Sequence, residues 1–289
     1  MTVATDSTVS TGARRLITAD AVFAARALDA GAIVGHAFAN FYAITARADA
    51  ATVRRVNLMK GRPPGQVGSI TAPPAAIRDV WDFGELPSGL NRRRVLKLID
   101  TFFTLGPFGF RGPAAGHIPA HLTFPDGPIT TSQVIAPGYS CPANDFLSRS
   151  LRATGDDFLY ITSANRSRHT TGADTPPPTR HSLAHWRADG LRAAFGDEPG
   201  FLIVEHPDES AARARYPRHL PMSTTILGFH RVEHVAGDPR PHLVLERHGS
   251  LPVDDVRAVL DDLGFGLVIG PRARTRLAPR DYSPRMSER

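Results

Sequence analysis

The stretch Met59-Lys60-Gly61-Arg62-Pro63-Pro64 places two cations one residue apart at the point where a helical pattern ends. Lys60 is one of only two lysines among many arginines, which favours a position that needs a compact ammonium group. An extended Lys-x-Arg pair held by a double proline can direct both cations at one polyanion, such as a triphosphate. The alternative interpretation of the stretch by itself is a solvated basic loop.

A second stretch, Phe158-Leu159-Tyr160-Ile161-Thr162-Ser163-Ala164-Asn165-Arg166-Ser167, is an apolar, β-branched run that changes into small polar residues. It predicts a buried strand that delivers Ser163, Asn165 and Ser167 to its C-terminal edge. Open α/β sheets bind their ligands at that edge. The two stretches together favour a site for an anionic ligand.

A Lys-x-Arg pair followed much later by a strand and Ser-Ala-Asn-x-Ser resembles the YrdC family of threonylcarbamoyl-AMP synthases and their relatives. The resemblance implies an α/β fold, a single domain with a twisted, open, mixed sheet and flanking helices. It also implies that Lys60, Arg62, Ser163 and Asn165 hold the phosphates of a nucleotide, with Lys60 and Arg62 as the catalytic residues. Apolar runs around Ile161 and elsewhere agree with interior strands of such a sheet.

Two later segments extend the resemblance. Ser223-Thr224-Thr225-Ile226-Leu227-Gly228 is similar to the family's Ser-Thr-Ile-Val-Asp strand, and Arg247-His248-Gly249 is similar to its closing Arg-x-Gly. The resemblance therefore adds Ser167, Thr225 and Arg247 to the nucleotide-binding set. The order of these short motifs, rather than any one of them, carries the specificity.

The acceptor side of the family pattern is altered. The segment His36-Ala37-Phe38-Ala39-Asn40-Phe41-Tyr42 stands where relatives have a Pro-Thr-Asp/Glu substrate loop. Threonine would leave its polar groups unpaired beside Ala37 and Phe38, at a cost of roughly 1–3 kcal/mol each. Further polar residues of the family pattern are replaced on what we expect to be the same side of the pocket, by Gly109, Ile135 and Gly228.

The acceptor is therefore expected to be bulkier or less polar than threonine. Phe38, Phe41 and Phe108 are expected to line its pocket, with His36 at the mouth. Such a chain would be a specialised relative rather than the tRNA-modifying enzyme itself.

Composition sets outer limits on the class of protein. The 289 residues are 42% hydrophobic, which suffices for a real core, and the formal net charge of +6 favours anionic partners such as nucleotides and RNA. Cys141 is the only cysteine, so no internal disulfide is possible. We see neither a signal peptide nor a membrane span in the sequence, and expect a cytoplasmic protein that does not bind membranes.

The expected domain organisation is a mobile tail over 1–16, one nucleotide-binding domain over 17–263 and a basic tail over 264–289. The first helix, capped by Thr18, is expected to bury a stripe of Val22, Phe23, Ala27 and Leu28. Asp49 is expected to cap the helix that ends at Lys60. The polar, proline-rich segment 166–180 stands where the relatives cover their site, so the resemblance implies a lid here rather than a linker between domains.

Two classes of function remain open. In the first, the protein binds ATP with Mg²⁺ and is a nucleotidyltransferase that forms a carbamoyl-adenylate on a small-molecule acceptor. In the second, it is an inactive relative that binds nucleotides or double-stranded RNA through its basic surface, including Arg92-Arg93-Arg94, and its basic tail. Three histidine pairs have i,i+4 spacing but lack a His-Glu-x-x-His motif, so no metal site made by the protein is expected.

Overall fold

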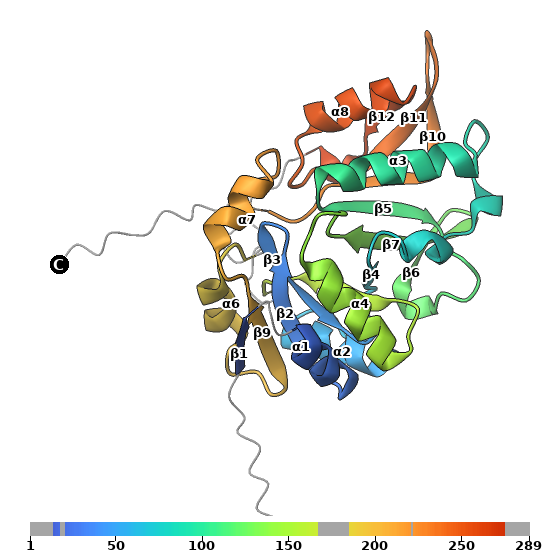
Figure 1. Cartoon of the computed structure of the whole chain (residues 1–289). Coiled ribbons are helices and arrows are strands. Elements are labelled where there is room, and N and C mark those ends of the chain that lie inside the picture. Colours follow the sequence, from blue (N-terminus) through green and yellow to red (C-terminus); the bar gives the residue numbers. More distant parts are fainter. Residues whose placement is uncertain (1–13, 18–20, 167–184, 221, 275–289) are drawn as a thin grey trace, which may run out of the picture.

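The computed structural model describes residues 14–17, 21–166, 185–220 and 222–274. Within these residues the chain forms one mixed α/β sheet of twelve strands with helices packed around it (Figure 1). The strand order is β1-β9-β2-β3-β8-β4-β7-β5-β10-β11-β12, and β6 pairs with β7 off this path. The expected open, mixed α/β sheet is confirmed, because parallel pairs such as β2 with β9 alternate with antiparallel pairs such as β2 with β3.

The strands and helices have the following bounds. The strands are β1 (Arg14–Ile17), β2 (Ile33–Phe38), β3 (Phe41–Ala46), β4 (Ser69–Thr71), β5 (Phe108–Pro113), β6 (Thr123–Asp126), β7 (Ile129–Ala136), β8 (Leu159–Ser163), β9 (Phe201–Glu205), β10 (Ile226–Val235), β11 (Asp238–Arg247) and β12 (Gly266–Ile269). The helices are α1 (Ala21–Asp29), α2 (Ala50–Met59), α3 (Arg92–Leu105), α4 (Ala143–Thr154), α6 (Ala188–Phe195), α7 (Glu209–Arg215) and α8 (Val253–Asp262). Short 3-10 turns lie at Ile77–Val80, Phe83–Glu85, Ala120–Leu122 and Pro271–Ala273.

Both faces of the central strands are covered. Ile33 and Val34 are neighbours on β2 but belong to different clusters, since alternate side chains of a strand point to opposite faces. Val34 packs with Leu28 of α1 and Phe146 of α4, whereas Ile33 belongs to the main core. Figure 1 shows α1 and α4 side by side at one end of the sheet, with α3 and α8 at the other.

Helix α2 has the structure that its sequence predicts. The Asp49 side chain accepts a hydrogen bond from the Thr52 backbone N–H at 2.9 Å, and Lys60 is the C-cap. Val53, Val56 and Met59 are buried. Local capping and apolar spacing are sufficient to place Lys60 at the end of this helix.

The apolar stripe expected on the first helix is wrong for Val22 and Phe23 and correct for Leu28. Val22 and Phe23 are 45% and 41% exposed, and the buried residues are Ala21, Ala24, Ala25 and Leu28. The inward face of the helix therefore consists of three alanines and Leu28, whereas Val22 and Phe23 point outward. The proposed cap, Thr18, lies outside the described residues.

The sheet extends beyond both expected domain boundaries. Strand β1, at Arg14–Ile17, pairs in parallel with β9, and β12, at Gly266–Ile269, pairs in parallel with β11. The segments expected to be loose tails from 1 to 16 and from 264 onward therefore include sheet residues. Backbone hydrogen bonding to a distant strand leaves no periodic apolar signal in such short segments.

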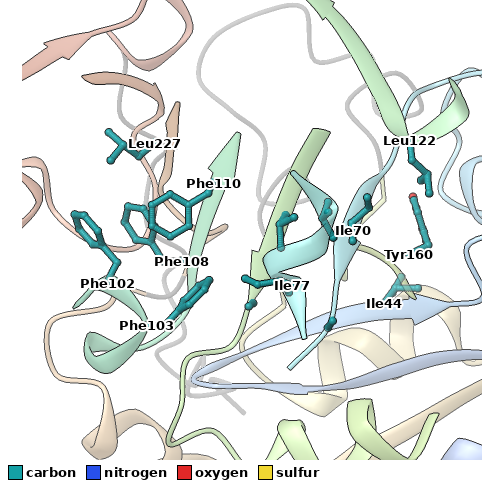
Figure 2. Close-up of a cluster of buried hydrophobic side chains, with 14 of the residues drawn as sticks. Ile44, Ile70, Ile77, Phe102, Phe103, Phe108, Phe110, Leu122, Tyr160 and Leu227 are labelled. Atoms are coloured by element: carbon teal, nitrogen blue, oxygen red, sulfur yellow. The ribbon is translucent and has the colours of Figure 1, made fainter. Parts of the chain in front are cut away.

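An aromatic cluster joins β5 to α3 (Figure 2). Phe102 of α3 and Phe108 of β5 stack with ring centroids 4.2 Å apart, and Phe103 and Phe110 meet edge to face at 5.5 Å. Phe108 has no exposed surface. Its expected place in an acceptor pocket is therefore wrong, because the side chain is used to attach α3 to the sheet.

No helix in the described residues is long and apolar enough to cross a membrane.

We expect Phe108→Ala to lower the free energy of unfolding by about 3–5 kcal/mol, because it removes a fully buried ring from a stacked pair. Urea unfolding followed by fluorescence measures this loss. Leu58→Ala on the exposed face of α2 is the control, since Leu58 is 54% exposed and should change stability by less than about 0.5 kcal/mol. A Phe108 variant as stable as the wild type would contradict a core role.

Candidate functional site

Lys60 connects the end of α2 to the end of β8. Its buried Nζ donates hydrogen bonds to the carbonyl oxygens of Ser163 and Asn165, the latter at 2.6 Å. Burial, with the nearby guanidinium groups of Arg62 and Arg166, lowers the pKa of Lys60 well below its usual value. The sequence expectation that the Lys60 and Ser163 segments meet is thus met, by bonds from the ammonium group to the backbone.

Arg166 makes a second connection between the same segments. It donates hydrogen bonds to the backbone oxygen of Met59 and, at 2.7 Å, to that of Ala194, and it pairs with Glu198 at 2.8 Å. Lys60 and Arg166 together position the turn that follows β8. Ser163 thus lies at the end of β8, and its carbonyl oxygen accepts a hydrogen bond from Lys60.

Arg62 and Arg247 form the cationic part of the site. Arg62 Nη1 donates to Thr162 Oγ1 at 2.7 Å, while Arg247 donates to the backbone oxygen and Oγ1 of Thr224 at 2.6 and 2.7 Å. Burial, and then the charge of Arg62, lowers the pKa of Arg247 to about 10. Burial also lowers the pKa of Arg62. Arg62 is thus close enough to Arg247 to disfavour the charged form of Arg247.

A cavity of about 230 Å³ opens beside these arginines. Its walls come from strands β2, β3, β4, β6, β7, β8 and β11 and from the segments after α2 and before β10. The lining residues are Phe38, Phe41, Ala43, Arg62, Gln66, Val67, Gly68, Ser69, Phe124, Gln133, Ile135, Tyr160, Ile161, Thr162, Ser163, Ser223, Thr224 and Arg247.

The cavity is electrostatically unbalanced. Arg62 and Arg247 line it, and no aspartate or glutamate does so among the described residues. Their hydrogen-bond partners on the protein are neutral threonine oxygens. Two half-buried cations without a neighbouring carboxylate favour an anion that completes the site. The geometry therefore suits an anionic ligand.

Part of the cavity lining is apolar. Phe38, Phe41 and Ala43 project from the same face of the β2–β3 hairpin and pack with Ile135 and Ile161. The rings of Phe38 and Phe41 lie 5.5 Å apart, centroid to centroid. A ligand bound against the arginines would thus have an apolar surface next to it.

The segment 36–42 is a tight hairpin rather than the expected substrate loop. Strands β2 and β3 are separated only by Ala39 and Asn40, and Ala39 has a φ of 57°. Two hydrogen bonds stabilise the turn. Asn40 Nδ2 donates to the His219 carbonyl at 2.8 Å, and the Ala39 N–H donates to Cys141 Sγ at 3.2 Å. Cys141 is a buried partner of this turn, and burial raises the pKa of its thiol.

His36 does not lie at the mouth of the pocket. It is buried on β2, with Nε2 2.7 Å from Thr45 Oγ1 and its ring 4.9 Å from that of Phe146. Burial lowers its pKa to about 4. A histidine that is neutral and enclosed by α4 is part of the core.

The remaining expected site residues are placed as follows. Thr225 is buried behind the cavity, where its Oγ1 donates to the Leu251 carbonyl at 2.8 Å. Asn165 is buried beside Ser163, and its Nδ2 donates to the Arg166 carbonyl at 2.7 Å. Ser167 and the proposed lid up to 180 lie outside the described residues, apart from Arg166 at its start.

The five altered acceptor-side positions do not all face one pocket. Phe38 and Ile135 line the cavity, whereas Ala37 points to the other face of β2 and joins the main core. A side chain at Gly109 would meet Ile226 at 2.8 Å, and one at Gly228 would meet His230 at 2.9 Å. The expectation that all five positions lie on the acceptor side is therefore wrong for Ala37, while Gly109 and Gly228 are not among the lining residues of this cavity.

Several lining residues were missed by the sequence analysis. Thr224, Gln133 and Tyr160 carry polar groups, and Gln133 Nε2 donates to Ser69 Oγ at 2.7 Å. Thr224 stands directly beside Thr225 in the motif that drew attention to this strand. Only the tertiary position of Arg247 shows which of the two threonines faces the cavity.

One cluster has the composition of a metal site. Single ligand atoms from Asp126, His230 and Glu246 lie within 4.8 Å of one another. Both carboxylates are already paired with guanidinium groups, since Arg111 lies 3.3 Å from Asp126 and Arg231 lies 3.3 Å from Glu246. A metal ion there would have to displace two cations, so the arrangement fits a metal poorly.

The fold is shared with solved structures, although the sequence matches no protein-family model and no curated protein. A variant of P. abyssi Sua5 matches with a TM-score of 0.58 and 17% identity, covering 90% of this chain and 66% of that chain. Sua5 from P. abyssi complexed with L-threonine matches with a TM-score of 0.55 and 18% identity, covering 88% and 62%. The hypothetical protein smu.1377c from Streptococcus mutans UA159 matches with a TM-score of 0.61 and 12% identity, covering 91% and 99%.

The chain thus spans somewhat less than two thirds of the length of the Sua5 chains and nearly all of the streptococcal one. At these identities the likeness shows the fold. It is the YrdC-like fold that the sequence resemblance implies, over about nine tenths of the chain.

We expect stability to fall as the pH drops from about 6.5 to about 4. Burial lowers the folded-state pKa of both His36 and His219 to about 4, whereas the unfolded value is about 6.5. Between these values the unfolded chain binds protons that the folded chain does not, so each histidine removes about 1.4 kcal/mol per pH unit. Urea unfolding over a pH series measures the slope.

His36→Gln should make that slope shallower by the contribution of one proton. The control is His234→Gln, because His234 lies on the exposed end of β10. Equal slopes for the wild type and His36→Gln would show that His36 is not held neutral in the fold.

Proposed function

We propose that the cavity binds ATP, or an adenylate, with its phosphates against Arg62 and Arg247. The observation that carries this proposal is the pair of half-buried guanidinium groups that line a cavity without a carboxylate among the described residues. Ser163 adds a hydroxyl at the end of β8. Lys60 and Asn165 support the site from behind by positioning the Ser163–Arg166 turn.

The proposed reaction is formation of a carbamoyl-adenylate. A carboxylate oxygen of an N-carboxylated amine attacks the α-phosphorus of ATP, a new P–O bond forms, and the bond to the bridging oxygen breaks. Pyrophosphate leaves with that electron pair. Fixed guanidinium groups stabilise the charge that develops on the phosphoryl oxygens, which is where Arg62 and Arg247 would act.

Mg²⁺ is expected to accompany the nucleotide rather than to be held by the protein. No carboxylate lines the cavity among the described residues, and the Asp126–Glu246 cluster is paired with arginines. Mg²⁺ is commonly bound through substrate phosphates and several waters. The cation would then reduce the charge of the phosphates without a ligand from this wall.

The acceptor amine is proposed to be less polar than threonine. The apolar part of the cavity lining consists of Phe38, Phe41, Ala43, Ile135 and Ile161. A hydroxyl group placed there would lose water and gain no partner. P. abyssi Sua5 is known in complex with L-threonine, so a threonine test is a direct comparison. A cytoplasmic location is part of the same proposal.

The rival function, RNA binding without turnover, receives less support from the surface. Arg94 donates to the Gly89 and Gly264 carbonyls at 3.0 and 3.1 Å and lies 4.2 Å from the Phe265 ring centre. Arg92 lies 5.3 Å from the ring of Phe83. Two of the three consecutive arginines therefore contact the protein itself. The basic tail after 274 lies outside the described residues.

We expect isothermal titration calorimetry to show ATP binding to the wild type and roughly tenfold or weaker binding to Arg247→Gln. A lost hydrogen bond to a charged group is worth about 1.5–3 kcal/mol, and glutamine can still donate to Thr224. Arg54→Gln is the matched control because Arg54 is exposed on α2. Equal ATP affinity for both variants, with both folded, would contradict the proposal.

We expect pyrophosphate release from ATP and bicarbonate to be faster with apolar primary amines than with threonine. Phe38→Ala should reduce that preference, because it removes part of the apolar wall. A coupled pyrophosphate assay over a panel of amines gives the rates, and mass spectrometry identifies the adenylate. Threonylcarbamoyl-AMP formed at an ordinary enzymatic rate would refute the acceptor assignment.

A further inference from the structure

A second cavity, of about 240 Å³, lies directly beside the first. The two share Phe124, Gln133 and Arg247 in their walls, and the second adds Arg111, Glu246 and Arg272. Arg247 thus faces both cavities. Neither cavity alone reaches about 300 Å³, the lower end of ordinary small-molecule sites, whereas the two together exceed it.

The carboxylate of this second cavity is already neutralised. Glu246 lies 3.8 Å from Arg111 and 3.3 Å from Arg231, and the neighbouring Asp126 lies 3.3 Å and 3.7 Å from the same two arginines. His230 bonds Asp126 at 2.9 Å, and burial lowers its pKa, so it adds no positive charge at neutral pH. Two guanidinium groups and two carboxylates balance each other there.

Arg247 and Arg272 remain as excess charge. Neither has a carboxylate partner among the ion pairs of the described residues, and both line the second cavity. Arg272 is exposed on the Pro271–Ala273 turn, beyond the end of β12, whereas Arg247 is held by Thr224. The second cavity is therefore cationic, like the first, and reaches solvent at Arg272.

We propose that the second cavity is a pyrophosphate subsite, lined by Arg247 and Arg272. This rests on the proposed function in one respect: the pyrophosphate would be the β- and γ-phosphates of a nucleotide whose α-phosphate lies against Arg62. When the bridging P–O bond breaks, the leaving pyrophosphate takes the electron pair and the added charge. Arg247, which lines both cavities, is placed to stabilise that charge.

Calorimetry with inorganic pyrophosphate, ATP and AMP on the full chain tests the subsite. Arg272→Gln should weaken pyrophosphate and ATP binding about tenfold, the loss of one charge-assisted hydrogen bond, and should leave AMP binding unchanged. Arg274→Gln is the matched control, since Arg274 is also exposed, lies two residues away and does not line the cavity.

Glu246→Gln gives a result of opposite sign. Removing the one carboxylate in the cavity wall should tighten pyrophosphate binding severalfold, whereas damage to the fold would only weaken it. Thermal unfolding of each variant separates the two effects. Unchanged or weaker pyrophosphate binding by a folded Glu246→Gln protein would count against the subsite.

Failure of the subsite is distinguishable from failure of the proposed function. If the wild type binds no pyrophosphate, or if Arg272→Gln and Arg274→Gln weaken it equally, the subsite is wrong even where ATP and AMP still bind. If pyrophosphate binding depends on Arg272 but neither nucleotide binds, the subsite stands and the nucleotide proposal fails.

Discussion

The buried ammonium group of Lys60 is the constraint on which the site depends. It ends α2 and donates to the carbonyl oxygens of Ser163 and Asn165, which lie far away in the sequence. A buried cation is costly unless its donors are used, so the carbonyls must come to it. That requirement sets the position of the turn after β8, and with it one wall of the cavity. Arg62, two residues on, is placed by the same connection.

The two arginines that line the cavity, Arg62 and Arg247, lower the stability of the fold because no carboxylate among the described lining residues pairs with them. Arg62 and Arg247 are both half-buried, and the charge of Arg62 helps to lower the pKa of Arg247. Elsewhere in the fold the protein pairs such charges, as where Arg111 and Arg231 meet Asp126 and Glu246. The contrast between this balanced cluster and the unbalanced cavity beside it supports the proposal that the cavity binds an anion.

The apolar wall depends on strand alternation. Phe38 and Ala37 are neighbours, yet one lines the cavity and the other joins the core, because successive side chains of β2 point to opposite faces. Phe108 is likewise withdrawn into the stack with Phe102. Of the residues that differ from the family pattern, only Phe38 and Ile135 therefore contribute to the apolar part of the cavity lining.

The sequence by itself determined the fold class, the helix that ends at Lys60 and the strand that ends at Ser163. Those features depend on local periodicity, on a capping aspartate and on motif order, all of which can be read along the chain. Only the tertiary structure shows that the Lys60 ammonium group donates to backbone carbonyl oxygens and that Thr224 accepts hydrogen bonds from Arg247. It also shows that β1 and β12 belong to the sheet. Depth in the fold and the pairing of distant strands arise from long-range packing, for which no short stretch of sequence carries a signal.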